Sequence, residues 1–183
     1  MDEKGLIKLI FEAGILSRTP RTGPYHVGIT NHETIASHVY RQMLLAYFLA
    51  QAEKADTGKV LKMSLVKDLP EARTLDLTFI QKKYLEIKGG EERVLRDQLR
   101  GLKGSKELED FFEEYNKNET IEAHAANDAS ILEALVEAKE YVQLGAKIME
   151  RWFLGKKEKL KTKTGRKLFG LLEKWSFYWW ADR

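Results

Sequence analysis

Residues 63–76 combine a hydrophobic run with three carboxylates in a short length of chain. Asp68, Glu71 and Asp76 fall within nine positions, directly after the apolar part of the segment. Acids at the end of a buried segment are costly unless a cation shares their surroundings, because burial disfavours the charged form of a carboxyl group. We therefore expect a positive group beside them, and Lys67 is the nearest one in the sequence.

His38 is a second residue able to do chemistry, on a long predicted helix that continues to about residue 50. Neutral imidazole is a common metal ligand, and carboxylates often complete such sites. Each residue also has a plainer interpretation. His38 could be a core histidine bonded to a carbonyl group, Asp68 and Glu71 could be solvated helix-end acids, and Asp76 could cap a helix beginning near Thr78.

Together these residues resemble the motifs of the HD-domain phosphohydrolase superfamily, in particular its small all-helical branch that includes the 5′-deoxynucleotidases. In that family a histidine on an early helix, a His-Asp doublet on a later helix and a distant aspartate hold a divalent metal. His38 matches the first histidine, and Asp68 matches the acid of the doublet. Lys67 stands where the doublet has its histidine, and Ser130 stands where the family has its last metal-binding aspartate.

Further motifs extend the resemblance over about residues 6 to 155. Glu71 and Asp76 match the family's His-Asp-x-x-Glu-x-x-x-Gly-Asp run, with Leu75 in place of its glycine. The other matches are residues 18–23 with the Arg-x-Pro-Arg-Thr-Gly segment, Glu33 with a glutamate before the first histidine, residues 127–133 with the Lys-Asp-Ala-Asp-x-Leu-Glu motif, and Glu140 and Tyr141 after it.

The resemblance implies hydrolysis of a phosphate ester on a nucleotide or a similar phosphorylated metabolite, assisted by Mn, Co, Mg or Zn. His38 and Asp68 would be metal ligands, and Glu71 would orient or deprotonate the attacking water. Asp76 would protonate the departing oxygen or hold the sugar. Arg21 would bind the phosphate, because a planar guanidinium can donate to two phosphate oxygens.

The replacements at Lys67 and Ser130 put the metal in question. A lysine ammonium has three donors and no lone pair, so it cannot act as a metal ligand. Asp128 is no ready substitute for Ser130, because two residues along a helix rotate a side chain by about 200°. We expect the Lys67 ammonium to pair with Asp68, and also with Asp76, where an ion would otherwise lie.

Two functions therefore stay open. The first is a phosphohydrolase whose activity is weakened or lost. The second is a catalytically silent protein that binds a phosphorylated ligand or a partner subunit and needs no metal cofactor, with Lys67 contributing positive charge to ligand binding.

Composition sets broad limits on the class of protein. With 183 residues and 43% hydrophobic content, the chain is expected to form one domain over residues 1–183. It has no cysteine, no evident signal peptide and no apolar segment long enough for a bilayer, so we expect a cytoplasmic protein without a membrane partner. The 32% charged content favours a thermophilic source, and a net charge of +3 is too small to indicate nucleic acid as a partner.

The hydrophobic pattern is helical throughout, which predicts an all-α, HD-domain helical bundle. A loop is expected over residues 19–29, with Thr30 or Asn31 capping the helix that carries His38. The remaining predictions are an N-terminal helix, a helix carrying residues 67–68, and helices over about 91–100, 105–116, 120–143, 146–154 and 163–180.

Aromatic side chains crowd the end of the chain, in residues 175–180 (Trp-Ser-Phe-Tyr-Trp-Trp). A terminal helix or hook that docks these rings against the bundle is one interpretation. An exposed patch that forms a homodimer is the other main one, because aromatic residues are enriched at interfaces.

Overall fold

The computed structural model describes residues 2–78, 80–85 and 89–181. Within these residues every regular element is helical, and a lone bridge between Pro20 and Thr34 is the only extended pairing. The prediction of an all-α fold is confirmed. None of the described helices is long and apolar enough to cross a bilayer.

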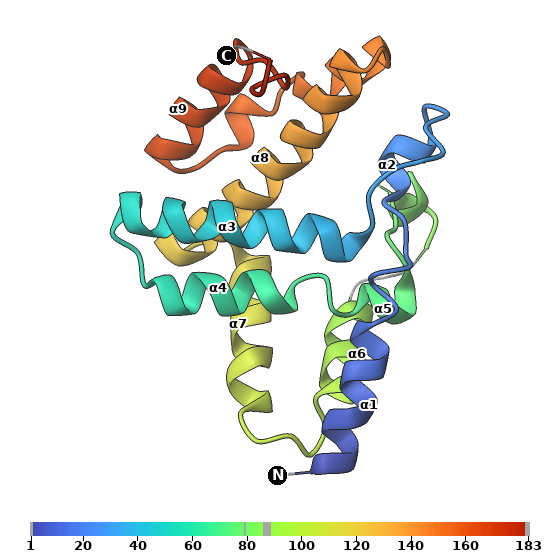
Figure 1. Ribbon diagram of the computed structural model, residues 1–183. Helices are drawn as coiled ribbons and strands as arrows, with labels where there is room; N and C mark the ends of the chain where they lie inside the picture. The colour runs from blue at the N-terminus through green and yellow to red at the C-terminus, as the bar shows by residue number, and fades with distance from the viewer. Residues whose placement is uncertain (1, 79, 86–88, 182–183) are drawn as a thin grey trace.

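Figure 1 shows the elements in chain order, with the two ends of the chain at opposite ends of the molecule. They are α1 (Glu3–Ala13), α2 (Thr22–Tyr25), α3 (Ile35–Glu53), α4 (Thr57–Val66), α5 (Glu71–Thr74), the 3₁₀ helix η1 (Gln81–Lys83), α6 (Gly90–Gln98), α7 (Ser105–Lys117), α8 (Ile121–Gln143), the 3₁₀ helices η2 (Lys147–Phe153) and η3 (Lys157–Lys159), and α9 (Lys163–Leu172).

The main core lies where the antiparallel pair α3 and α4 packs against α8 (Figure 1). Leu49 of α3, Met63 of α4 and Leu132 of α8 are almost completely buried there. The adjoining face of α8 is rich in alanine, with Ala126 and Ala129 fully buried. Small side chains let helix backbones approach closely, and this approach brings α8 against the helices that carry His38 and Lys67.

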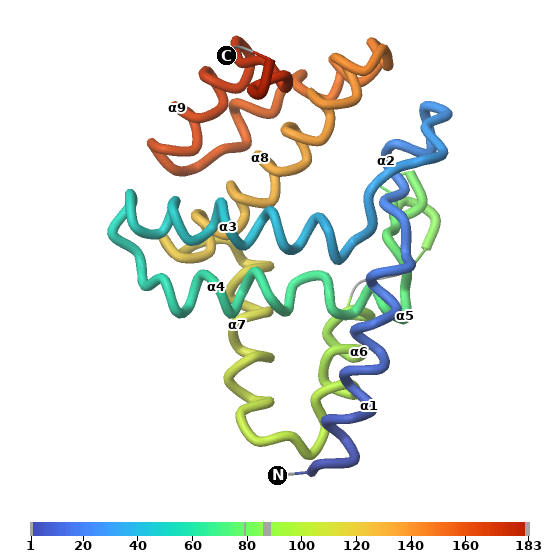
Figure 2. The backbone as a smooth tube through the Cα atoms, in the orientation of Figure 1, coloured from blue at the N-terminus to red at the C-terminus, as the bar shows by residue number. Residues whose placement is uncertain are grey.

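A second cluster joins the lower helices, where α1 and α6 run side by side (Figure 2). Val66 at the end of α4 packs with Leu95, Leu99 and Phe112, and Leu9 of α1 covers the group. Val66 thereby fixes the end of α4, and the next residue in the chain is Lys67.

The helix carrying His38 begins later than the sequence suggested. Thr34, not Thr30 or Asn31, caps α3, and its hydroxyl accepts a hydrogen bond from the backbone N–H of Ser37. The bridge to Pro20 holds Thr34 in the extended conformation that an N-cap requires.

The C-terminal part also differs from prediction. Residues 147–153 form a 3₁₀ helix, and α9 ends at Leu172, well before residue 180. The aromatic segment after α9 is a hook, attached by a 3.0 Å hydrogen bond from the Tyr178 hydroxyl to the Gln143 carbonyl.

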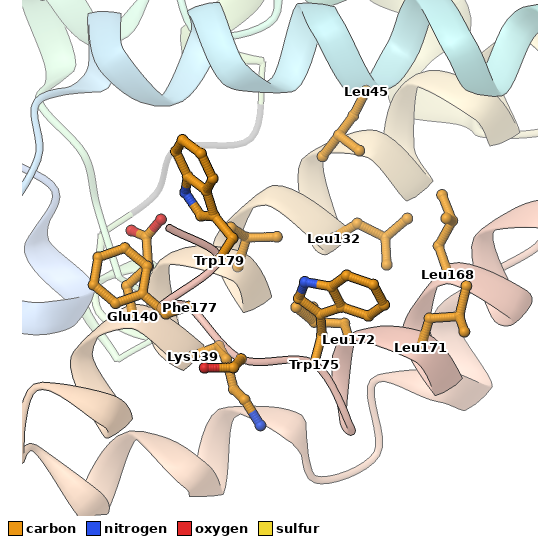
Figure 3. A pocket seen from close by; sticks show the side chains of 12 residues that line it. Leu45, Leu132, Lys139, Glu140, Leu168, Leu171, Leu172, Trp175, Phe177 and Trp179 are labelled. Carbon is orange, nitrogen blue, oxygen red and sulfur yellow. The ribbon is translucent and has the colours of Figure 1, made fainter. Parts of the chain in front are cut away.

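The hook covers an apolar cavity of about 460 Å³ without burying its own rings. In Figure 3, leucines of α3, α8 and α9 face the same space as the rings of Trp175 and Trp179. Trp175 is 65% exposed and Trp179 is 67% exposed, so the segment is not core in the ordinary sense. A homodimer formed through these rings stays a prediction.

Leu75 gives the first testable prediction. Its backbone has φ 64° and ψ 171°, a region that is essentially restricted to glycine, and its side chain is 56% exposed. We expect Leu75→Gly to raise the free energy of unfolding by about 1 kcal/mol. The free energy gained by relieving backbone strain in the folded chain exceeds the entropic cost of ordering a more flexible glycine. The melting temperature should rise by about 2–4 °C.

Leu75→Ala is the matched control, because alanine keeps the Cβ atom that makes this conformation unfavourable. If Leu75→Gly melts no higher than Leu75→Ala, backbone strain is not the reason why the family motif has glycine here.

Candidate functional site

His38, Lys67 and Asp68 meet at the centre of the molecule, where α3 passes the end of α4. The Lys67 ammonium lies 3.3 Å from His38 Nε2 and donates a hydrogen bond to Asp68 Oδ2. His38 Nε2 and Asp68 Oδ2 are themselves 3.8 Å apart. All three residues are buried, so the ammonium occupies the position between the two expected metal ligands.

The charges of these groups agree with that arrangement. Burial, and then the charge of Lys67, lower the pKa of His38 well below its ordinary value, so the imidazole is neutral. Although burial opposes a charged ammonium, Asp68 outweighs it and the pKa of Lys67 is raised. A neutral His38 can accept from Lys67 through Nε2 while its Nδ1–H donates to Glu133.

An ion-pair network surrounds the other side of His38. Arg41 Nη2 lies 2.6 Å from Glu133 Oε1 and 2.8 Å from Glu33 Oε2, and its Nη1 lies 2.8 Å from Glu140 Oε1. Burial, and then the charge of Glu33, raise the pKa of Glu133 to about 7. Arg41 therefore holds several carboxylates that would otherwise repel one another.

A divalent metal does not fit the residues between His38 and Asp68. The Lys67 ammonium fills that position and offers no lone pair. Burial raises the pKa of Tyr115, while the charge of Lys67 and the hydroxyl of Ser130 oppose this rise, so the serine and the ammonium both lie near the tyrosine. In the alignment proposed from the sequence, Lys67 and Ser130 stand in for two of the family's four metal ligands, and His38 and Asp68 match the other two.

Asp128 does not restore the missing ligand. Its carboxylate accepts hydrogen bonds from the backbone N–H groups of Lys161 and Thr162, at 2.9 and 2.8 Å, and from the Thr162 hydroxyl at 2.6 Å. The prediction that Asp128 points away from the side faced by Ser130 is confirmed. It anchors the start of α9.

A different group of possible metal ligands lies on the Nδ1 side of His38. Ligand atoms of Glu33, His38 and Glu133 all lie within 4.8 Å of one another. Arg41 already binds both carboxylates, and Glu133 also accepts from His38, so a metal would have to displace existing partners.

Glu71, Arg21 and Asp76 lie around the same centre. Burial, and then the charges of Asp68 and Asp76, raise the pKa of Glu71 to about 9, so Glu71 is protonated near neutral pH. Although burial opposes the charged form, the charges of Asp76 and Asp68 raise the pKa of Arg21. The buried Nε of Arg21 has no hydrogen-bond partner among the described residues. All six residues singled out in the sequence therefore gather in one region.

The sequence had suggested an ion pair between Asp76 and Lys67, and the structure does not show one. Asp76 Oδ2 accepts a 2.8 Å hydrogen bond from the Thr22 backbone N–H, and the Asp76 carbonyl accepts one of 2.6 Å from the Thr22 hydroxyl. Nor does Asp76 cap a helix near Thr78, because the next helical element, η1, begins only at Gln81. Its carboxylate instead fixes the start of α2 next to Arg21.

The sequence interpretation missed the roles of Glu133, Glu137 and Arg41. A signal was available, because Ser130, Glu133 and Glu137 are three and four residues apart and so share one face of a helix. Three polar residues on the face of α8 that carries Ser130 predict a buried polar cluster.

Glu137 gives a prediction about pH. It is 1% exposed, and burial, and then Glu33, raise its pKa to about 8, while Arg21 opposes the rise. Between the ordinary pKa of 4.5 and this value the folded chain holds a proton that the unfolded chain has lost. A buried carboxyl group of this kind lowers the free energy of unfolding by up to about 1.4 kcal/mol for each unit by which the pH rises between these two pKa values.

We therefore expect the melting temperature to fall from pH 5.5 to pH 8, with Glu71 and Glu133 contributing in the same direction. Glu137→Gln should make the fall smaller, because glutamine cannot ionise and is close to glutamate in size and shape. Equal slopes for Glu137→Gln and wild type, measured by thermal unfolding at each pH, would argue against a buried, protonated Glu137.

Comparisons with known proteins agree with this architecture. The family model described as HD domain matches residues 13–170. Related proteins include 5′-deoxynucleotidase HDDC2 of Xenopus laevis, 27% identical with 77% of this chain and 71% of the relative covered, and 5′-deoxynucleotidase hdd1 of Schizosaccharomyces pombe, 31% identical with 78% and 71% covered. A conserved hypothetical protein of Pyrococcus furiosus has a similar structure, with a TM-score of 0.78, 32% identity, and coverage of 92% of this chain and 97% of that one.

The chain therefore belongs to the HD-domain family, as the resemblance had predicted. The curated relatives named above are 5′-deoxynucleotidases.

Proposed function

We propose that this protein binds a nucleotide or a related phosphate ester and that its phosphohydrolase activity is weakened or lost. The contact that carries the proposal is the Lys67 ammonium, bonded to both His38 Nε2 and Asp68. It supplies a fixed positive charge where the family holds a metal, but it cannot lower the pKa of a bound water as a metal does.

Glu71 supports the same conclusion. With a pKa of about 9 it is protonated near pH 7, so it can donate a proton but cannot take one from water. A general base matched to neutral pH needs a pKa near 7. The positive charges of Lys67 and Arg21 oppose this rise in pKa but do not cancel it, so the carboxyl group stays neutral near pH 7.

Arg21 supports retention of ligand binding. Its guanidinium is close to Asp76 and Asp68, and its Nε lacks a partner among the described residues. An arginine in this state can donate to two phosphate oxygens, which would compensate a buried donor. The proposed roles are thus phosphate binding for Arg21, charge balance for Lys67, and orientation of the ester oxygens for Glu71 and Asp76.

A panel of deoxynucleoside monophosphates and simple phosphate esters tests the proposal. We expect several of them to raise the melting temperature of the wild type, while phosphate release with added Mn, Co, Mg or Zn stays close to that of Glu71→Ala. Arg21→Ala should weaken binding at least about tenfold, because a charge-assisted pair contributes about 1.5–3 kcal/mol.

Arg18→Ala is the matched control, since Arg18 lies in the same loop and is exposed. The proposal fails on the binding side if no phosphate ester binds, or if the two arginine variants bind alike. It fails on the activity side if the wild type turns over substrate far faster than Glu71→Ala.

A further inference from the structure

A large cavity opens beside the candidate site, lined by residues of α2, of the segment after α5 and of the 3₁₀ helix η2. Its volume is about 730 Å³, within the range of cavities that hold small-molecule ligands. Arg21 and Asp76 lie in its wall, so the cavity is continuous with the proposed phosphate position.

Two further cations line the cavity, Arg151 in η2 and Lys156 in the turn after it. Neither they nor Arg21 form an ion pair with any residue that the structure describes. Lys156 is half-buried, and burial, followed by the charge of Lys159, lowers its pKa. Among the described residues of the wall, Asp76 is the one carboxylate, and it already accepts from the Thr22 N–H. These residues therefore give the cavity an excess of positive charge.

Close packing holds the two sides of the cavity together. Trp152, next to Arg151, lies so near Gly23 that a Cβ atom at residue 23 would be 2.2 Å from the indole ring. Gly23 follows Arg21 by two residues. The contact therefore fixes the segment carrying Arg151 and Lys156 relative to the segment carrying Arg21.

We propose that Arg151 and Lys156 form a second anion subsite in this cavity, so that the preferred ligand carries two phosphate groups. One phosphate contacts Arg21 and the other contacts Arg151 and Lys156. This inference rests on the proposed phosphate-binding function and narrows its ligand to a nucleoside diphosphate, a nucleoside bisphosphate or a smaller diphosphate. Cations without ion-pair partners on two separate segments suit two anionic groups better than one.

Isothermal titration with four probes tests the inference: deoxyadenosine 5′-monophosphate, its 5′-diphosphate, adenosine 3′,5′-bisphosphate and inorganic pyrophosphate. We expect at least one doubly phosphorylated probe to bind about tenfold more tightly than the monophosphate, with the preference decreasing as salt rises. Comparing the four probes shows whether the phosphates must be linked and whether the nucleoside is needed.

The variant Arg151→Gln with Lys156→Gln should bring the affinity for that probe down to that for the monophosphate, while monophosphate affinity stays within about twofold. The matched control is Lys147→Gln with Lys157→Gln, which removes two exposed charges from the same region outside the cavity wall. Thermal unfolding of both variants shows that each is folded.

Each remaining outcome decides the question. If the monophosphate binds and no doubly phosphorylated probe binds more tightly, the second subsite is wrong while the proposed function stands. If the cavity variant weakens all phosphates equally, the cations share one phosphate and the inference is overturned. If nothing binds, the proposed function and the inference both fail.

Discussion

Lys67→Met is expected to lower the free energy of unfolding by about 3–5 kcal/mol. Removing one partner of a buried ion pair leaves the other charge uncompensated, which costs far more than the pair itself contributes. Here Asp68 would lose the ammonium and His38 Nε2 would lose its donor. Urea unfolding monitored by circular dichroism, with a chelator present throughout, measures the change.

The double variant Lys67→Met with Asp68→Asn is the control for this prediction. It removes both charges, so it should recover most of the lost stability, which a simple packing defect at residue 67 would not allow. If Lys67→Met alone lowers the free energy of unfolding by less than about 1 kcal/mol, the ammonium does not balance a buried carboxylate.

Lys67→His combined with Ser130→Asp should restore the family's ligand set and raise phosphate release from deoxynucleoside monophosphates at least about 100-fold with Mn, Co or Zn. The reason is geometric, since His38 Nε2 and Asp68 Oδ2 already lie 3.8 Å apart, and Ser130 lies near Tyr115, whose pKa the charge of Lys67 also affects. Lys67→His alone or Ser130→Asp alone should raise phosphate release less than the double variant does, because each single variant still lacks one metal ligand. The measurement is release of inorganic phosphate at saturating metal.

Lys67→Gln with Ser130→Asn is the matched control, because it removes the ammonium and changes the same two positions without supplying metal ligands of the family type. If this control releases phosphate as fast as the Lys67→His, Ser130→Asp variant, then removal of the lysine, and not the restored metal ligands, causes the gain in activity. A folded His and Asp variant that stays inactive and binds no metal would contradict the alignment of Lys67 and Ser130 with the family's ligands.

The sequence predicted those parts of the site that depend on local order along the chain. Lys67 and Asp68 are adjacent, so an ion pair between them follows from the need to balance an acid at the end of a buried helix. The orientation of Asp128 away from Ser130 follows from helical rotation alone. Both predictions needed no knowledge of which helices pack together.

Contacts between distant segments were beyond the sequence pattern. The partner of Asp76 is the backbone of Thr22, 54 residues away, and the partner of His38 Nδ1 is Glu133, 95 residues away. The helical spacing of Glu133 can predict that it shares a face with Ser130, but its pairing with His38 arises only when α8 packs across α3. Backbone donors such as the Thr22 N–H leave no trace in side-chain patterns.

Errors in the helix boundaries have the same origin. Residues 146–154 and 173–180 carry hydrophobic side chains at helical spacing, but the first segment forms a 3₁₀ helix and the second a hook. Their apolar residues face the apolar cavity or the main core from short segments. Tertiary packing therefore overrides the helical preference of these stretches.

Elemental analysis of the purified wild-type protein, after equilibration with Mn, Co and Zn and removal of free ions, tests the central claim most directly. With the Lys67 ammonium between His38 and Asp68, we predict well below one metal per chain, and about one per chain in the Lys67→His, Ser130→Asp variant. About one tightly held metal per wild-type chain, lost on replacing His38 or Asp68 by alanine, would contradict the account.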